Sequence, residues 1–155
     1  MQLYILRHAN ADTEAATDEA RELSEKGREQ ARKVARFCAL HGITPDVIFS
    51  SPLIRAQQTA KPVAKDLGME VTTVRWLACG ATPVGILGQL AAFGESATVM
   101  LVGHQPDLGE LIAHLLGAAQ GASVNVRKAS LTLVEVLLPR KGGGRLEFSI
   151  PARMM

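Results

Sequence analysis

Short apolar runs that each lead into a helical pattern are the feature that most constrains the fold of this chain. The runs at residues 2–8 and 98–104 are apolar on both faces, which is typical of central strands in a sheet covered on both sides. Further strands are expected at 46–51 and 71–77. Because a helical pattern follows each run, we expect a mostly parallel sheet whose strands are connected by helices.

Four segments with helical patterns separate these strands from one another and from the end of the chain. They are expected at residues 25–40, 52–68, 84–93 and 106–117. Ser24 is the expected N-cap of the first helix, and Pro52 is expected at the first position of the second. Pro62 lies inside the second helical segment and is expected to kink or divide it.

The last part of the chain contains two more strand patterns. They span residues 130–138 and 145–151 and are joined by a glycine-rich turn, which indicates a hairpin. The whole pattern predicts an α/β three-layer sandwich, with a mostly parallel central sheet flanked by helices and a C-terminal hairpin. No linker or internal repeat divides the sequence, so residues 1–155 are expected to form a single domain.

Composition excludes several classes of function. The 47% hydrophobic and 21% charged residues are ordinary for a globular protein, and 155 residues suffice to bury a core without disulfides or metals. With a net charge of +2 and 4% aromatic residues, a nucleic-acid partner is not expected. No apolar run is long enough to cross a bilayer, and no signal-peptide pattern opens the chain. We therefore expect a cytoplasmic protein without a membrane partner.

The residue types that bind metals do not occur at the spacings of a metal site. Cys38 and Cys79 form no CxxC pair and have no histidine at metal-binding spacing. The carboxylates form no cluster of the kind that Mg²⁺ sites use. Cys38 falls on the apolar face of the first helix and is expected to be a buried free thiol. We expect neither a metal nor a cofactor.

Basic side chains lie at the ends of the predicted parallel strands. Arg7 and His8 close the first strand. His104 closes the strand at 98–104, and Arg55 lies in the first turn of the second helix. Because the carboxyl ends of parallel strands meet at one edge of a sheet, these side chains are expected to converge there. Two guanidiniums beside helix N-termini suit phosphate, and a neutral imidazole can attack phosphorus as a nucleophile.

Four ordered blocks of the sequence resemble the histidine phosphatase superfamily, also called the phosphoglycerate mutase-like fold. The blocks read "LYILRHANAD", "LSEKGREQARKVA", "IFSSPLIRAQQTA" and "LVGHQPDLGELIAHLLG". The short length and the closing "RKASLTLVEV" are most similar to the SixA-type phosphohistidine phosphatases. The resemblance implies that residues 1–155 form one histidine phosphatase domain.

The resemblance also implies roles for individual residues. It makes His8 the nucleophile, and it makes Arg7, Arg55 and His104 the phosphate pocket. Arg21 matches a basic residue common in this branch, so it is expected either to touch phosphate or substrate from the rim or to be a solvated loop arginine. The sequence departs from the family pattern at Ala9, where the superfamily usually has Gly and some members of this branch have Ala.

A carboxylic acid that could protonate a leaving oxygen is missing from its usual places in this superfamily. Residues 71–94 contain no Asp or Glu, and Gln105 follows the second histidine. An alkoxide needs such an acid, whereas an imidazole can leave already protonated, so the absence favours a phosphorus–nitrogen bond in the substrate. Asp107 is expected to favour the N-terminus of its helix. Asp12 or Glu14 could still supply a proton from the loop.

The leading hypothesis is therefore a phosphohistidine phosphatase that acts on a phosphorylated protein, such as a phosphorelay domain, and releases inorganic phosphate. It would work through a covalent phosphohistidine and without a metal. A protein substrate suits a short chain that has no insertion long enough to form a lid over a small metabolite. The alternative is a small-molecule phosphomonoesterase of the same superfamily, for a sugar phosphate or a similar ester. A third hypothesis is a non-catalytic module that binds phosphohistidine.

Overall fold

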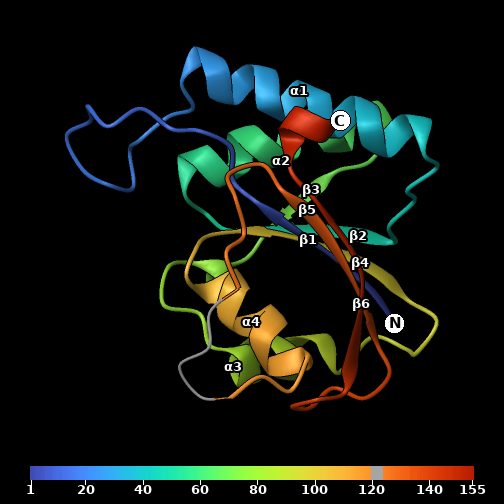
Figure 1. Ribbon diagram of the computed structural model, residues 1–155. Helices are drawn as coiled ribbons and strands as arrows, with labels where there is room; N and C mark the ends of the chain where they lie inside the picture. The colour runs from blue at the N-terminus through green and yellow to red at the C-terminus, as the bar shows by residue number, and fades with distance from the viewer. Residues whose placement is uncertain (120–123) are drawn as a thin grey trace.

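The computed structural model describes residues 1–119 and 124–155, which form a six-stranded sheet between two layers of helices (Figure 1). The strands are β1 (Gln2–Arg7), β2 (Val47–Ser50), β3 (Val71–Thr73), β4 (Thr98–Gly103), β5 (Leu131–Val136) and β6 (Gly144–Ile150). The helices are α1 (Glu25–Leu40), α2 (Ile54–Leu67), α3 (Pro83–Leu90) and α4 (Asp107–Leu115), with short 3₁₀ turns η1 (Arg75–Leu77) and η2 (Ala152–Met154). The predicted three-layer sandwich is confirmed.

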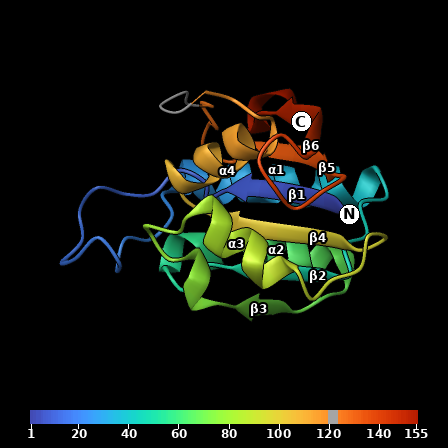
Figure 2. The ribbon, with the colours of Figure 1, turned by 90° about the horizontal axis from the view of Figure 1, so that it is seen from below.

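The strand order of the sheet is β3-β2-β4-β1-β5-β6. The first four of these strands are parallel, whereas β5 pairs antiparallel with β1 and β6 pairs antiparallel with β5. Helices α1 and α2 cover one face of the sheet, and α3 and α4 cover the other (Figures 1 and 2). The mostly parallel sheet and the C-terminal hairpin are therefore as predicted.

None of the helices in the described ranges has both the length and the hydropathy needed to cross a membrane.

The neighbouring strands β1 and β4 form the switch point of the sheet. The chain leaves β1 toward α1 on one face and leaves β4 toward α4 on the other, which opens a crevice at their carboxyl ends. The two strands pair in parallel with Arg7 opposite Gly103. Figure 2 shows the heads of both strands at one edge of the sheet, from which the loop after β1 projects.

Both faces of β1 are buried, which explains its continuous apolar sequence. Leu3 and Ile5 pack into the core beneath α3 and α4, whereas Tyr4 and Leu6 pack into the core beneath α1 and α2. Successive residues point to opposite faces of a strand, so both sides must be apolar. Each fully buried leucine or isoleucine stabilises the fold by about 1.5–3 kcal/mol. This burial anchors the strand that ends at Arg7.

The predicted strand over 71–77 is too long. β3 pairs with β2 only as far as Thr73, which lies opposite Ser50. Beyond this point β2 has ended, and the chain turns into η1, whose Leu77 is buried in the core beneath α3 and α4. A strand cannot continue where its only neighbouring strand stops, so this part of the prediction was wrong.

The prediction that Pro52 is the first helical residue was wrong, and α2 is not divided at Pro62. Pro52 precedes the helix, because the Ser51 hydroxyl accepts the N–H of Leu53 and Leu53 becomes the N-cap in extended conformation. Pro62 does not divide α2, which continues to Leu67. Proline removes one backbone hydrogen bond from a helix. The buried residues on either side of it, including Ala60, Val63 and Ala64, hold α2 against the core.

Gly27 sets how closely α1 approaches the chain that follows His8. The Ser24 hydroxyl caps α1 as predicted and accepts the N–H of Gly27 at 3.1 Å. A Cβ atom at Gly27 would lie 1.9 Å from the carbonyl oxygen of Asn10. This oxygen also accepts the N–H of Ser24, so the backbone cannot move aside without breaking that contact.

We expect Gly27→Ala to destabilise the protein by about 1–3 kcal/mol, because the added methyl group overpacks a backbone contact. Gly88→Ala is the matched control, since Gly88 lies in a helix and a Cβ there meets nothing within 4 Å. The control should be neutral or stabilise the protein by about 0.5–1 kcal/mol. Urea unfolding of both variants measures the difference, and equal stabilities would contradict the close approach.

Candidate active site

The two histidines at the switch point lie side by side. His8 follows β1 and His104 follows β4, and the backbone N–H of His8 donates to the carbonyl of Gly103 at 2.9 Å. Their ring centroids are 5.2 Å apart. His8 is 8% exposed and His104 is 3% exposed. The strand register therefore brings together two buried imidazoles that are 96 residues apart in the sequence.

The ring of His8 has a defined orientation. Its Nδ1 atom lies 2.8 Å from the carbonyl oxygen of Ala9, which can only accept a hydrogen bond. Nδ1 therefore carries the proton and donates it, which leaves Nε2 with a free lone pair in the neutral ring. Burial lowers the pKa of His8 to about 3. The hydrogen bond to Ala9 opposes this shift, because it favours the charged form of the ring. The nearby charges of His104, Arg55 and Arg7 lower this pKa further, so His8 is neutral near pH 7.

His104 is held by the end of β2. Its Nε2 atom lies 2.7 Å from the hydroxyl of Ser51, the residue that follows β2. Its Nδ1 atom is buried and has no hydrogen-bond partner among the described residues. Burial lowers the pKa of His104 to about 4, and Arg55 lowers it further, while Asp18 opposes the shift. The site thus presents a second neutral imidazole with one nitrogen not engaged.

Arg55 brings a buried guanidinium to the same crevice from the first turn of α2. It is 4% exposed, and its Nε atom has no partner among the described residues. Nη1 donates to the backbone carbonyl of Asp18 at 2.5 Å, and Nη2 donates to the carboxylate of Asp18 at 2.8 Å. A buried guanidinium requires an anion, and here a loop carboxylate supplies it.

Arg7 completes the group that the sequence predicted. Its Nη1 atom donates to the carbonyl of Val126 at 2.8 Å, and its Nε atom is buried without a partner in the described part of the chain. Burial lowers the pKa of this guanidinium. Arg7 directly precedes His8 and lies opposite Gly103, and the His8 and His104 rings are 5.2 Å apart. The charges of Arg55 and Arg7 both lower the pKa of His8, which agrees with a site that holds all four predicted side chains.

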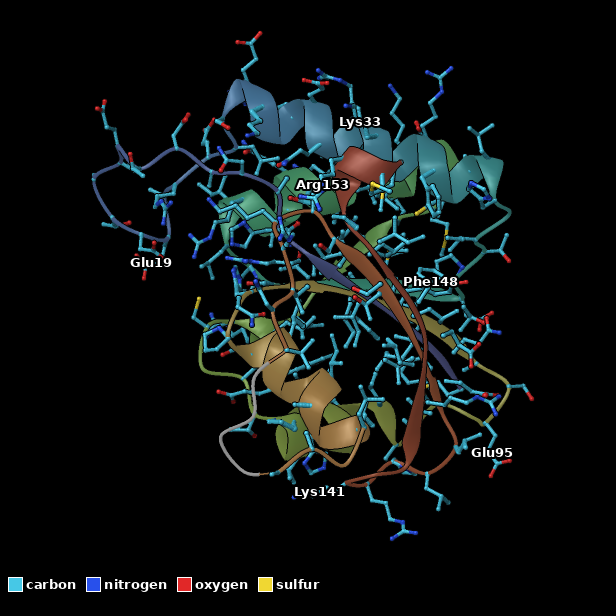
Figure 3. All side chains as sticks on the ribbon, in the orientation of Figure 1. Glu19, Lys33, Glu95, Lys141, Phe148 and Arg153 are labelled. Carbon is cyan, nitrogen blue, oxygen red and sulfur yellow. The ribbon has the colours of Figure 1, made fainter. Side chains whose placement is uncertain are left out.

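Arg21 reaches this group through Asp18. Its Nε atom donates to the carbonyl of Asp12 at 2.7 Å, and its Nη1 atom donates to the Asp18 carboxylate at 2.9 Å. Hydrogen bonds from Arg21 and then Arg55 hold the pKa of Asp18 below its usual value. Arg21 is therefore a rim residue bound to a carboxylate. Figure 3 shows the loop that carries Asp18, marked by Glu19, projecting beyond the sheet.

Sequence reasoning missed several residues that shape the site. Thr59 lies one turn after Arg55 on α2, accepts the N–H of Ala9 at 3.0 Å and donates to the carbonyl of Arg55 at 2.7 Å. Lys128 donates to the side chain of Asn10 at 2.8 Å. Burial, and then the charges of Arg7, Arg21 and Lys26, lower the pKa of this lysine. The spacing of Thr59 from Arg55 was a usable signal, whereas nothing local marked Lys128.

The carboxylates considered as proton donors lie elsewhere. Among the described residues, neither Asp12 nor Glu14 places its carboxylate in a hydrogen bond with a site histidine. Asp107 is buried and accepts the N–H groups of Gly80 and Ala81 at 2.8 and 3.1 Å, so it fixes the loop before α3. Asp107 lies in the first turn of α4, where its negative charge is expected to favour the helix N-terminus, and it also makes these two contacts. Across residues 1–119 and 124–155, no three His, Cys, Asp or Glu side chains converge as a metal-ligand set.

Two imidazoles and two guanidiniums at the switch point of an α/β sheet form a cationic crevice whose chemistry suits an anion. The sequence model of the histidine phosphatase superfamily (branch 1) matches residues 3–78. Phosphohistidine phosphatase SixA of Escherichia coli is 29% identical over 121 residues, which cover 74% of each chain. The phosphohistidine phosphatase SixA homolog of Haemophilus influenzae is 30% identical over 128 residues, which cover 76% of this chain and 78% of that one.

A solved structure has the same fold along almost the whole chain. The protein histidine phosphatase SixA, complexed with tungstate, aligns with a TM-score of 0.85 and 24% identity over 99% of this chain and 98% of that one. The chain belongs to the histidine phosphatase superfamily, in its SixA-type branch, and is a phosphatase of that superfamily. The resemblance seen in the sequence is confirmed.

The two buried histidines predict a loss of stability in acid. The unfolded chain binds a proton at each histidine below about pH 6.5, whereas the folded protein binds none until about pH 4 at His104 and about pH 3 at His8. The free energy of unfolding must therefore fall as pH falls through this window. At pH 5 the loss is about 2 kcal/mol per histidine.

Urea unfolding at pH 7.5 and pH 5 tests this expectation. The variant with both His8→Gln and His104→Gln should lose about 4 kcal/mol less than the parent protein over this interval, because glutamine does not titrate. Comparing each protein with itself at two pH values removes the direct effect of the substitutions on packing. Equal losses in the two proteins would show that the histidines are protonated in the fold.

Proposed function

We propose that this protein is a phosphohistidine phosphatase that hydrolyses phosphorylated histidine on a protein and releases inorganic phosphate. The observation that carries the proposal is the state of His8: a buried, neutral imidazole with Nδ1 bound to the carbonyl of Ala9 and Nε2 free. Such a nitrogen is an activated nucleophile without any further base. Residues 1–155 act as one histidine phosphatase domain.

In the first step, the lone pair of His8 Nε2 attacks the phosphorus of the substrate. The bond between phosphorus and the substrate's imidazole breaks, its electron pair stays on that imidazole, and a phosphohistidine forms on His8. Arg7, Arg55 and His104 surround the phosphoryl oxygens, whose charge they stabilise in the transition state. The unpartnered Nε atoms of both arginines are donors available for this purpose, and so is Nδ1 of His104 in the tautomer in which Ser51 donates to Nε2.

In the second step, water attacks the phosphorus of phosphorylated His8. The phosphorus–nitrogen bond breaks, its electron pair returns to Nε2, and a proton from water passes to the departing phosphate. The hydrogen bond from Nδ1 to Ala9 holds the ring in one orientation through both steps. No metal takes part in this scheme, because the arginines supply the positive charge.

In this scheme, Asp18 competes with phosphate for the donors of Arg55. Its carboxylate and its carbonyl take two donors of Arg55, the residue expected to bind phosphate. A phosphoryl group carries more charge and can take the same donors. The relative solved with tungstate, a tetrahedral oxyanion, supports anion binding in this fold. Arg21 then acts as a positioning residue that holds Asp18.

A phosphorus–nitrogen substrate fits this site better than an ester. Asp18 is the carboxylate that the structure brings to the arginines, and two guanidiniums keep it ionised. An ionised carboxylate cannot protonate a leaving alkoxide, whereas an imidazole can leave already protonated. The alternative, a small-molecule phosphomonoesterase, would need Asp18 or another loop carboxylate to act as the acid.

A side-by-side rate measurement tests the proposal. With EDTA present, a chemically phosphorylated histidine peptide should be hydrolysed at least ~100-fold more efficiently than glycerol phosphate, because only the alkoxide that leaves from this ester needs an acid. His8→Ala should lose at least ~1000-fold in turnover of either substrate, since it removes the nucleophile. Its melting temperature serves as the control for folding. A faster ester reaction would favour the phosphomonoesterase, and phosphate binding without turnover would favour a binding module.

Asp18→Asn tests whether this carboxylate competes with phosphate. The amide keeps the shape but removes the charge, so inhibition by inorganic phosphate should strengthen about 3–10-fold while phosphohistidine turnover persists. Glu19→Gln is the matched control on the same exposed loop and should leave inhibition unchanged (Figure 3). If Asp18→Asn instead abolishes ester turnover and spares phosphohistidine, Asp18 is the acid for esters.

A further inference from the structure

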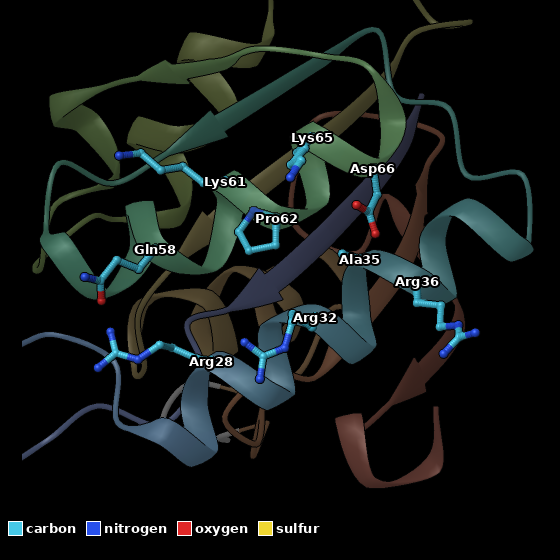
Figure 4. Close-up of a pocket in the computed structure, with 9 residues that line it drawn as sticks. All are labelled: Arg28, Arg32, Ala35, Arg36, Gln58, Lys61, Pro62, Lys65 and Asp66. Atoms are coloured by element: carbon cyan, nitrogen blue, oxygen red, sulfur yellow. The ribbon is translucent and has the colours of Figure 1, made fainter.

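A groove lined by basic side chains runs between α1 and α2, on the outer side of the helical layer that flanks the site (Figure 4). Its volume is about 710 Å³. Five cations line it: Arg28, Arg32 and Arg36 from α1, and Lys61 and Lys65 from α2. All five are exposed, and the single carboxylate among the lining residues is Asp66. We call this feature the basic groove.

The cations of the basic groove form two facing rows. Arg28, Arg32 and Arg36 are four residues apart, so they share one side of α1 and follow each other at roughly 6 Å. Lys61 and Lys65 do the same on α2. Figure 4 shows the two sets of side chains on opposite sides of the groove.

Most of the positive charge of the basic groove has no ion-pair partner among the described residues. Its one ion pair within 4 Å is between Arg28 and Glu22, at 3.9 Å. Other charged side chains of α1 pair away from the groove, as Lys33 does with Glu29 at 3.2 Å. The net charge of the chain is only +2, so this concentration is local. Such a surface attracts a partner with several negative charges.

The basic groove begins close to the candidate active site. Gln58 lines its near end and accepts the N–H of Leu23 at 2.6 Å, one helical turn after Arg55. Both helices begin at the edge of the sheet that carries His8, and Figure 4 shows the head of β1 at the end marked by Arg28 and Gln58. Lys61 lies six residues after Arg55, which is roughly 9 Å along the helix axis.

We propose that the basic groove docks an acidic segment of the phosphoprotein, next in sequence to the phosphohistidine that enters the active site. This inference rests on the proposed function and adds the chemistry of the partner. The floor, which contains Ala35 and Pro62, leaves room for a peptide backbone between the two rows. Three or four extended residues span roughly 10–14 Å, enough to connect the site with the cations.

Two features favour a polypeptide over other polyanions. The lining residues include no aromatic side chain on which bases could stack, as proteins that bind single-stranded nucleic acid use. Asp66 lies at the far end of the groove, beyond Lys65 in Figure 4. Its carboxylate could there pair with a basic residue of the docked peptide that follows the acidic stretch. The five cations are exposed surface groups with no buried polar donor among them, unlike the lining of a small-molecule site.

Two synthetic phosphohistidine peptides test the inference. Each carries a four-residue spacer after the phosphohistidine, followed by six glutamates in one and six glutamines in the other. We expect the parent protein to show about a tenfold lower KM for the acidic peptide, because several exposed charge pairs each contribute modestly. The preference should disappear in 0.5 M salt, which screens such pairs.

Arg32→Glu combined with Lys61→Glu changes one cation in each row. This variant should lose the preference for the acidic peptide while hydrolysing free phosphohistidine at the parental rate. Lys33→Glu combined with Lys141→Glu is the matched control, with the same change of charge outside the groove (Figure 3). The control should keep the preference. Loss of the preference in both variants would show that only the net charge of the protein matters. This result would overturn the inference that the basic groove docks the acidic segment.

A binding measurement separates this inference from the proposed function. Fluorescence anisotropy with a labelled, unphosphorylated six-glutamate peptide requires no turnover. Binding that the Arg32/Lys61 variant loses supports the basic groove even if phosphohistidine is not hydrolysed, an outcome that would refute the proposed function alone. Hydrolysis without any acidic preference would overturn the docking inference alone. If an oligouridylate displaces the labelled peptide and binds more tightly than it, the docking inference is overturned in favour of a nucleic-acid partner.

Discussion

The parallel pairing of β1 with β4 is the constraint on which the site depends. It places Arg7 opposite Gly103, so that the residues following each strand, His8 and His104, lie side by side at one sheet edge. The pairing is held by apolar side chains buried on both faces of the two strands. A slip of one residue would turn each side chain to the other face and separate the two rings. The rigid core thus determines the distance between the imidazoles.

Burial and positive charge act together on these imidazoles. Removal from water disfavours the charged form of a histidine, and the neighbouring arginines disfavour it further. The result is a cluster with cationic guanidiniums and neutral rings, which suits both anion binding and nucleophilic attack. The same positive field explains why a carboxylate, that of Asp18, lies on Arg55 and stays ionised there. A group that holds one anion so closely can exchange it for another.

Much of this arrangement was predictable from local patterns. Helix α1 begins and ends where its apolar periodicity and its Ser24 cap indicate, because both signals are encoded within a few residues. The positions of Arg7, His8, Arg55 and His104 followed from the rule that parallel strands end at one edge. The errors occurred where distant contacts override local preference. Neighbouring buried residues keep α2 continuous through Pro62, and β3 stops where its partner β2 stops.

The amino-acid sequence by itself determined the strands, the helices and the residue types that meet at the carboxyl edge, because periodicity and strand order constrain them. Only the tertiary structure decided which atoms are free to react. The contact of His8 Nδ1 with Ala9, of His104 with Ser51 and of Arg55 with Asp18 depends on backbone positions set by packing. Likewise, the two rows of cations become one basic groove only when α1 and α2 lie together, since helical spacing aligns each row but cannot place one row opposite the other.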